Sequence, residues 1–433
     1  MSLRHLAILV TFATACMRPS QSPFPAVSGM GPAYELKNGY WFDGKAFRPM
    51  TKYMVYHTLT DRRPVPVDSI IDLNGGYVVP PFGEAHNHNA VPSDTAISNK
   101  YLRGGIFYVK NPNNFTRDRD RSVGVFNTPT SIDVTFSNGS LTGPGGHPVD
   151  LAMRNIGRGV WKPEDGEGSF YYSVASKADV DRAWPRIVAS KPDFIKTYLL
   201  FSEEYAQRLR DTSTFGWRGL DPKLLPYIVK KAHDAKLRVA THVETATDFR
   251  NAVAAGVDEI NHLPGFRPEK DEMSGYANLD RYRLNGRDAS DAARHHVTVV
   301  TTTSEVIEIV NDARSKGGAT AQLATNVRDM LTNNLRVLRD AGVRIAIGSD
   351  RYRMTSAPEI PALRSLGIFS DAELIRMWSM DTPREIFPDR KIGSLDAGWE
   401  ASFLVLDGNP LTDFSALGRI KMRMKQGVIL EIQ

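Results

Sequence analysis

The chain has 433 residues, of which 41% are hydrophobic and 24% charged, a composition typical of a globular protein with a substantial core. Its formal net charge of +5 is spread thinly, and residues 117–121 alternate Arg and Asp instead of forming a basic block. No basic patch is interleaved with aromatic side chains, so the composition argues against nucleic acid as a partner. With a single cysteine, the chain cannot form an intrachain disulfide.

The first residues have the pattern of an export signal. Residues 6–15 are apolar and uncharged, too short to span a bilayer but suited to the core of a signal peptide. Cys16, the only cysteine, follows directly, and the three residues before it resemble a bacterial lipobox without its usual Leu. We expect a signal peptide over residues 1–15 and a flexible, lipidated tether over residues 16–32. The protein would then be an exported periplasmic or outer-membrane lipoprotein that touches the membrane only through its anchor; a plain secretory signal is the alternative.

The sequence predicts short β-strands at both ends of the chain, and the two groups of strands need each other to form a core. Residues 33–77 and residues 388–433 each contain several short apolar runs separated by turns. Neither end has enough strands to close a core alone. We therefore expect one small β-sandwich built from both ends, with residues 78–387 inserted between them.

The middle of the chain alternates short apolar runs with helical patterns. Candidate strands lie near residues 78, 105, 132, 193, 237, 257, 297 and 343. Short buried strands alternating with helices favour a parallel sheet. Eight such units predict an α/β fold of the (β/α)8 TIM-barrel type over residues 78–387.

Helix ends are marked at several places. Gly256 and Gly342 are expected to end helices, because glycine adopts the left-handed conformation at the C′ position. The pair Asp221-Pro222 predicts the start of the helix that precedes the strand near 237. Ser370 and Glu373 predict a capping box for a helix that begins at residue 371.

Ligand-type side chains fall at the ends of these predicted strands. They are His86 and His88 after the first strand, Lys196 in the fourth, His242 in the fifth, His262 in the sixth and Asp350 after the eighth. Strand side chains alternate in direction, so His86 and His88 should point the same way, into the mouth of a barrel. One inward histidine is more often a hydrogen-bonded core residue than a ligand, but six ligand-type residues at successive strand ends indicate a metal site.

These motifs resemble those of the amidohydrolase superfamily, in the branch of prolidase-like and imidazolonepropionase-like enzymes. The similar segments are residues 78–88 in the first strand, 143–147 in the third, 240–242 in the fifth, 259–262 in the sixth, 347–350 in the eighth and 392–411 in the closing sandwich. The resemblance covers roughly residues 36–430. Pro81, Glu84 and Ser402 depart from the usual Gly, Asp and Asp, and none of them is a ligand.

The resemblance implies a hydrolase with two divalent metal ions, most simply Zn2+. One ligand set would be His86, His88 and Asp350, the other His242 and His262, with Lys196 bridging them. An ammonium group has no lone pair to donate, so Lys196 would bridge as a carbamylated lysine (carboxylysine). The ions would clamp a bridging hydroxide, and Asp350 would take its proton and pass it to the leaving amine. A single ion beside an unmodified, ion-paired Lys196 is the alternative.

Four further residues are candidates for contact with the substrate. His147 could hydrogen-bond the substrate carbonyl or the oxyanion, or be a plain loop residue. Tyr198 lies two residues beyond Lys196 on the same face of its strand and could line the pocket. Arg351 and Arg353 follow Asp350 and could bind a substrate carboxylate, or be surface arginines.

We expect a small-molecule substrate whose amide bond is cleaved, such as a dipeptide or an N-acyl amino acid. A lactonase or phosphotriester hydrolase would use the same two-metal site, and a mononuclear deaminase or ring-opening hydrolase would leave Lys196 unmodified. A surface binding protein without catalysis would have no use for the proton shuttle at Asp350. An oligomer is compatible with each of these functions.

The lipid anchor can be tested by the Cys16→Ser substitution. It should release the protein from the membrane fraction or stall its processing, because the lipid would be attached to the Cys16 thiol. Fractionation of cells that express either form is the measurement. If both forms behave as the same soluble protein, the predicted anchor is wrong.

Overall fold

The computed structural model describes residues 32–267, 269 and 273–432. Residues 32–433 form one compact unit. The predicted signal peptide, Cys16 and the tether up to residue 31 lie outside the described residues. Within the described part of the chain, no helix combines the length and the apolar composition needed to cross a bilayer.

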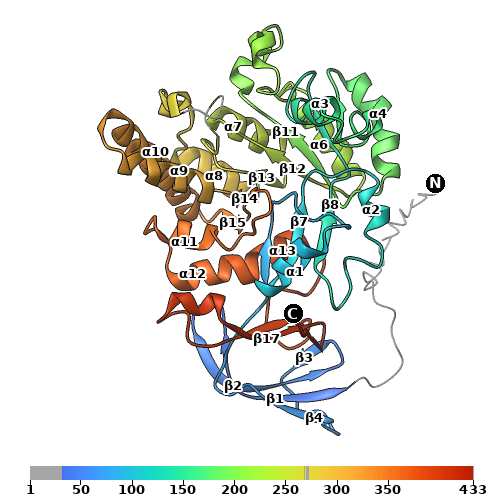
Figure 1. Cartoon of the computed structure of the whole chain (residues 1–433), viewed down its shortest axis with the longest axis vertical. Coiled ribbons are helices and arrows are strands. Elements are labelled where there is room, and N and C mark those ends of the chain that lie inside the picture. The colour runs from blue at the N-terminus through green and yellow to red at the C-terminus, as the bar shows by residue number, and fades with distance from the viewer. Residues whose placement is uncertain (1–31, 268, 270–272, 433) are drawn as a thin grey trace, which may run out of the picture. The chain divides into compact units, whose positions relative to one another are not determined.

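Strands from both ends of the chain pair in one sheet. Its order is β18-β17-β16-β5-β1-β2-β3, with β4 paired to β1. These strands are β1 (Ala33–Phe42), β2 (Phe47–Val55), β3 (Thr58–Thr60), β4 (Ser69–Asp72), β5 (Tyr77–Val79), β16 (Phe403–Leu406), β17 (Ile420–Lys425) and β18 (Val428–Ile429). Antiparallel pairing of β5 with β16 joins the two ends, and Trp41 packs edge-on against Phe403 with ring centroids 5.6 Å apart. Figure 1 shows β1–β4 and β17 grouped together, away from the parallel strands β11–β15.

The middle of the chain forms two parallel sheets, in the orders β6-β7-β8 and β10-β9-β11-β12-β13-β14-β15. The first contains β6 (Phe82–Glu84), β7 (Ile106–Asn111) and β8 (Asp133–Phe136). The second contains β9 (Ser140–Thr142), β10 (Tyr171–Ser173), β11 (Phe194–Tyr198), β12 (Arg238–His242), β13 (Glu259–Asn261), β14 (Thr298–Thr301) and β15 (Arg344–Ile347). A strand is present at each of the eight predicted positions.

The first predicted strand is divided in two. Residues 77–79 pair in the end sheet as β5, and residues 82–84 pair with β7 as β6. Pro80 and Pro81 lie between them, and proline has no N–H to donate to a sheet. The chain therefore leaves one sheet and enters the other at these two prolines.

The edges of the two parallel sheets approach each other on both sides. β8 pairs with β7, and after residues 137–139 the same stretch continues as β9, which pairs with β11. Left-handed backbone at Asn138 and Gly139, with φ of 54° and 93°, turns the chain between the two halves. At the other side, the N–H of Ala85, just after β6, donates at 2.7 Å to the carbonyl of Ile347, the last residue of β15.

Helices alternate with the parallel strands along the chain, as can be followed by colour in Figure 1. They are α1 (Thr95–Arg103), α2 (Asp118–Arg121), α3 (Val149–Gly157), α4 (Lys177–Ala189), α5 (Tyr205–Arg208), α6 (Leu225–Asp234), α7 (Ala246–Ala255), α8 (Gly286–Arg294), α9 (Ser304–Ser315), α10 (Gly318–Asp340), α11 (Glu359–Arg364), α12 (Asp371–Arg376) and α13 (Thr382–Ile386). The ends at Gly256 and Gly342 are confirmed, both in left-handed conformation, and so is the capping box of Ser370 with Glu373. The predicted start at Asp221 is wrong: its carboxylate accepts from Lys223 N–H in a preceding turn, and α6 begins at Leu225.

Candidate metal centre

Three histidines surround the carboxylate of Asp350. The Nε2 atoms of His86, His88 and His262 lie 3.7, 3.2 and 3.8 Å from its oxygens. These residues lie within four residues of the carboxyl ends of β6, β13 and β15. The side chains of His86 and His262 are almost completely buried, and that of His88 is partly exposed. Four of the predicted ligands therefore meet at one end of the parallel strands.

Hydrogen bonds on the second imidazole nitrogen orient two of these rings. His88 Nδ1 donates to the carbonyl of Asn113 at 3.2 Å, and His262 Nδ1 lies 2.7 Å from Thr302 Oγ1. Histidines that bind metals usually have such a partner, because it fixes the tautomer and the orientation of the ring. Both contacts leave Nε2 on the side of the ring that faces Asp350.

The donor atoms fit a divalent metal ion. His262 Nε2 is buried and has no hydrogen-bond partner among the described residues, an arrangement that is costly unless another group binds there. Within the described part of the chain, ligand atoms of His86, His262 and Asp350 lie within 4.8 Å of one another. Imidazole nitrogens combined with a carboxylate are a donor set found in zinc sites.

The backbone at this group is strained. His262 and Asp350 adopt left-handed φ values of 74° and 50°, which cost about 1–3 kcal/mol each in residues other than glycine. The N–H groups of Ser349 and Asp350 both donate to the carbonyl of His86, at 3.1 and 3.0 Å. These bonds hold the turn after β15 against the turn after β6.

Burial and charge favour the forms of these side chains that bind a cation. Burial lowers the pKa of His86, His242 and His262 well below the usual value, so their imidazoles are neutral. Burial is the largest single effect on Asp350 and raises its pKa, but His86, His88 and Arg267 together lower it by more, so the net pKa of this carboxyl lies below its usual range. A charged carboxylate therefore faces two neutral imidazoles, those of His86 and His262.

His242 and Lys196 lie beside this group but have protein partners of their own. The ring of His242 is 4.4 Å from that of His262, and its Nε2 is 2.9 Å from Glu244 Oε1. Lys196 Nζ donates to Asn261 Oδ1. Burial lowers the pKa of Lys196 to about 7, so the amine and ammonium forms are comparable near neutral pH. Sequence analysis did not single out Glu244 or Asn261, although each lies within two residues of a predicted ligand.

A buried ion pair supports the floor of the site. Lys110 Nζ is 2.5 Å from Glu259 Oε2, and both side chains are almost fully buried. Asn261 Nδ2 donates to Glu259 Oε1 at 2.7 Å, which links this pair to Lys196. Burial raises the pKa of Glu259, but Lys110, Arg238 and a hydrogen bond with Glu385 together lower it by more, so the carboxyl stays charged.

Two of the predicted substrate residues lie next to His242. The His147 ring is 6.1 Å from that of His242 and 5.2 Å from that of Tyr198, and the Tyr198 and His242 rings are 5.3 Å apart. His147 Nδ1 lies 3.2 Å from Asp150 Oδ1. The structure thus brings His147 and Tyr198 to the same side of the candidate centre.

The two predicted arginines are paired with carboxylates from other segments. Arg351 lies 2.7 Å from Glu308 on α9, and Arg353 lies 3.1 Å from Asp94, before α1. Arg353 is more than half exposed, whereas Arg351 is mostly covered. Their binding to a substrate carboxylate stays a prediction.

Asn87 and Asn89, which alternate with His86 and His88, bind the loop around Asp350 through hydrogen bonds. Asn87 Nδ2 donates to Ser349 Oγ at 2.7 Å, and Ser349 Oγ donates to Glu84 Oε2 at 3.2 Å. Asn89 Nδ2 donates to the carbonyls of Arg351 and Met354. Burial raises the pKa of Glu84 well above its usual value, so this side chain is a neutral acid. Their alternation with His86 and His88 was the available signal for Asn87 and Asn89.

Comparisons with known proteins agree with this arrangement. The sequence profile of the amidohydrolase family matches residues 217–430. Among solved structures, an amidohydrolase is 19% identical with a TM-score of 0.68 and covers 93% of this chain and 100% of its own. A prolidase complexed with N-methylphosphonate-L-proline is 18% identical with a TM-score of 0.67 and the same coverage. The A. niger ochratoxinase is 17% identical with a TM-score of 0.69, covering 93% of this chain and 96% of its own.

The search of curated proteins finds no match. At these low identities the solved structures show a shared fold and no more. The family match is what identifies the class: residues 217–430 are an amidohydrolase family domain, and this superfamily is one of metal-dependent hydrolases.

The buried pair at the floor of the site generates a prediction. Lys110→Met leaves the Glu259 carboxylate buried without its cation, so the free energy of unfolding should fall by about 3–5 kcal/mol. The double variant Lys110→Met/Glu259→Gln removes both charges and should regain most of that loss. Urea denaturation of the three proteins measures both effects. A double variant no more stable than Lys110→Met would show that the pair is not the source of the loss.

Proposed function

We propose that the protein hydrolyses amide bonds of small molecules, such as dipeptides or N-acyl amino acids, with divalent metal ions. The observation that carries the proposal is the arrangement of His86, His88 and His262 around the charged carboxylate of Asp350. The similarity of the fold to that of a prolidase supports the amide class and the prolidase-like branch of the superfamily.

The proposal includes a closed (β/α)8 barrel. The continuous stretch from β8 to β9 and the hydrogen bond from Ala85 to Ile347 support closure at the two edges of the parallel sheets. In such a barrel, active sites lie at the carboxyl ends of the strands, where the candidate centre is found.

Bound metal ions would polarise the scissile carbonyl and lower the pKa of an attacking water. Asp350 is charged and lies at the centre of the histidines, so it can accept the proton of that water and deliver it to the leaving amine. His147 stands beside His242 and can donate to the carbonyl oxygen as negative charge develops on it. Burial raises the pKa of Tyr198, which keeps its phenol protonated as a hydrogen-bond donor.

A second ion is part of the proposal, with zinc as the preferred metal. His242 and His262 would hold it, and carbamylated Lys196 would bridge it to the first ion. Supporting features are the short distance between the two imidazole rings and the burial of an amine that is partly neutral. His242 would have to exchange its contact with Glu244 for the ion. A metal content that stays at one per chain after growth with zinc and bicarbonate would overturn the second ion.

The export and the lipid anchor at Cys16 complete the proposal, and they rest on the sequence pattern of residues 1–16. A periplasmic or outer-membrane location would place the enzyme where small exogenous amides arrive. The Cys16→Ser experiment described above tests this part alone.

The function is tested by the turnover of N-acyl amino acids, dipeptides, lactones and phosphotriesters by zinc-loaded protein. We expect the amides to be cleaved best, and Asp350→Asn to lower kcat by about 10²–10⁴-fold, because the proton shuttle is removed. Elemental analysis should show that metal is retained. Asp413→Asn, an exposed aspartate at the start of a short helical turn, is the matched control and should keep full activity.

Two results would contradict the proposal. Lactones or phosphotriesters turned over faster than every amide would assign the site to ester chemistry. Unchanged turnover in Asp350→Asn with metal retained would show that this carboxylate does not move the proton.

A further inference from the structure

One nitrogen of the His147 ring is bound by a carboxylate. Its Nδ1 lies 3.2 Å from Oδ1 of Asp150, which belongs to the first turn of α3. The same ring lies beside those of Tyr198 and His242, with centroids 5.2 and 6.1 Å away. With Nδ1 bound by Asp150, Nε2 is the ring nitrogen that remains for a ligand.

The carboxyl group of Asp150 is charged. Burial raises its pKa, but His147, Arg154 and the backbone N–H of Leu151 together lower it by more, so the net pKa lies below its usual value. A charged carboxylate only accepts hydrogen bonds, so Nδ1 of His147 is the donor in this contact. When the ring is cationic, Nε2 donates as well, and Asp150 supplies the opposite charge.

The side chain of Asp150 has little room to turn. The loop after β11 packs against it at Gly216, where a Cβ would lie 2.7 Å from both Cβ and Cγ of Asp150. Gly216 has a left-handed φ of 79°, and its N–H donates to the carbonyl of Gly145 at 2.9 Å. The second oxygen of Asp150 accepts from Arg154 at 3.1 Å. Both carboxylate oxygens therefore have partners, and the neighbouring loop restricts their movement.

The backbone around His147 is held by Arg218. The N–H of His147 donates to the carbonyl of Arg218 at 2.9 Å, and Nε of Arg218 donates to the carbonyl of Pro144 at 2.9 Å. Nη1 of this buried arginine also donates to the carbonyl of Arg208 at 2.5 Å. The segment that carries His147 is thus fixed to the loop after β11.

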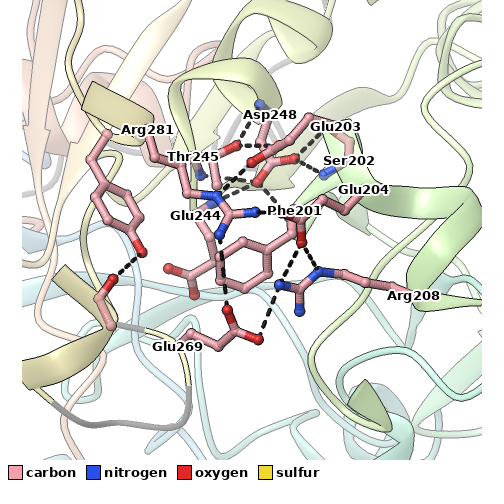
Figure 2. Close-up of polar contacts among 12 residues, drawn as sticks. Phe201, Ser202, Glu203, Glu204, Arg208, Glu244, Thr245, Asp248, Glu269 and Arg281 are labelled. Atoms are coloured by element: carbon pink, nitrogen blue, oxygen red, sulfur yellow. Dashed lines mark hydrogen bonds and ion pairs between the residues drawn. The ribbon is translucent and has the colours of Figure 1, made fainter. Parts of the chain in front are cut away.

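Arg208 is itself held by an ion-pair network, shown in Figure 2. Its guanidinium lies 2.8 Å from Glu204 and 3.0 Å from Glu269. Arg281 lies 2.5 Å from Glu204, and Phe201 packs against both guanidinium groups, whose Cζ atoms are 4.1 and 4.7 Å from its ring centroid. Because these charges share partners and Arg208 is nearly buried, the network is more than a set of exposed pairs. The support of this loop is therefore preorganised before a substrate binds.

We propose that Asp150 is a positioning residue for the proposed amide hydrolysis, which holds the ring of His147 so that Nε2–H donates to the carbonyl oxygen of the substrate. The inference rests on the proposed function and adds a residue that sequence analysis did not single out. As the attacked carbonyl carbon becomes tetrahedral, negative charge develops on its oxygen, and the hydrogen bond from Nε2 becomes stronger. The ring keeps its proton in this step, and Asp150 balances its charge.

A purely structural role for Asp150 makes a different prediction. A carboxylate in the first turn of a helix is stabilising there, and so is an ion pair four residues apart such as that with Arg154. If Asp150 served only α3, removing Arg154 would have part of the same effect. Arg154→Met removes the helix pair and leaves the contact with His147 in place, so it is the matched control.

The first test compares amide turnover by zinc-loaded wild type, Asp150→Ala and Asp150→Asn. Asp150→Ala should lower kcat by about 10²-fold, because the donor is no longer held in place. KM should change by less than about threefold, since the hydrogen bond gains its strength in the transition state. Asp150→Asn keeps the size of the side chain and loses its charge, so its kcat should fall as well. Arg154→Met should keep the kcat of wild type.

A double variant shows whether Asp150 acts through His147. His147→Asn should lower kcat at least as much as Asp150→Ala does. Adding Asp150→Ala to His147→Asn should cause no further loss, because two residues that serve one interaction are not additive.

The second test needs no turnover. In spectra of zinc-loaded protein labelled with 15N in its histidines, Nδ1–H of His147 should give a signal that exchanges slowly with water, because it is hydrogen-bonded to a carboxylate. The signal is assigned by its loss in His147→Asn. It should also be lost in Asp150→Ala and remain in Arg154→Met.

Several outcomes would overturn the inference. They are an unchanged kcat in Asp150→Ala and Asp150→Asn, an equal loss in Arg154→Met, additive losses in the double variant, and a His147 signal that survives Asp150→Ala. Failure of the proposed function looks different. In that case wild-type protein hydrolyses no amide, while the His147 signal and its dependence on Asp150 remain.

Discussion

One constraint underlies the candidate centre: the end of β6 must lie directly against the end of β15, about 260 residues later in the chain. Two N–H groups from the turn after β15 donate to the carbonyl of His86, and Asn87 donates to Ser349 across a separation of 262 residues. Gly348 permits this contact, since a Cβ there would lie 2.8 Å from His86 Cβ and 3.0 Å from His86 N. Without this approach, Asp350 would not reach the imidazoles of His86 and His88.

The same approach is costly, and the surrounding residues offset the cost. Left-handed backbone at His262 and Asp350, buried imidazoles and a partly buried carboxylate all disfavour folding. Other buried ionisable groups of the site add little to this cost. Lys110 and Glu259 neutralise each other in an ion pair, and Glu84 is a neutral acid. A metal ion that binds only to the folded protein would offset part of this cost, so the free energy of unfolding should rise when the metal binds.

Much of the site could be predicted from the sequence, because strand ends can be located by apolar runs and inward side chains by their spacing of two. This logic found His86, His88, His262 and Asp350, which the structure brings together. It also located strands at all eight positions, but it merged β5 with β6, because two prolines that interrupt hydrogen bonding do not interrupt an apolar pattern.

Side-chain partners could not be predicted, because they depend on segments distant in sequence. The contacts of Arg351 with Glu308 and of Arg353 with Asp94 bring together loops that no local pattern relates. The same holds for Glu244, whose carboxylate touches both His242 and the backbone of Arg267. The start of α6 was also predicted too early, because Asp221 accepts from an N–H of the turn that precedes the helix.

The most direct test of the candidate centre is anomalous diffraction from crystals of the zinc-loaded protein, collected on both sides of the zinc absorption edge. We predict a strong anomalous peak about 2.0–2.2 Å from Nε2 of His86, Nε2 of His88 and a carboxylate oxygen of Asp350, the distances usual for zinc ligands. A second peak beside His242, with extra density on Lys196, would establish the bridging carbamate. Zinc found only elsewhere, with His262 Nε2 still without a ligand, would contradict a metal centre at this place.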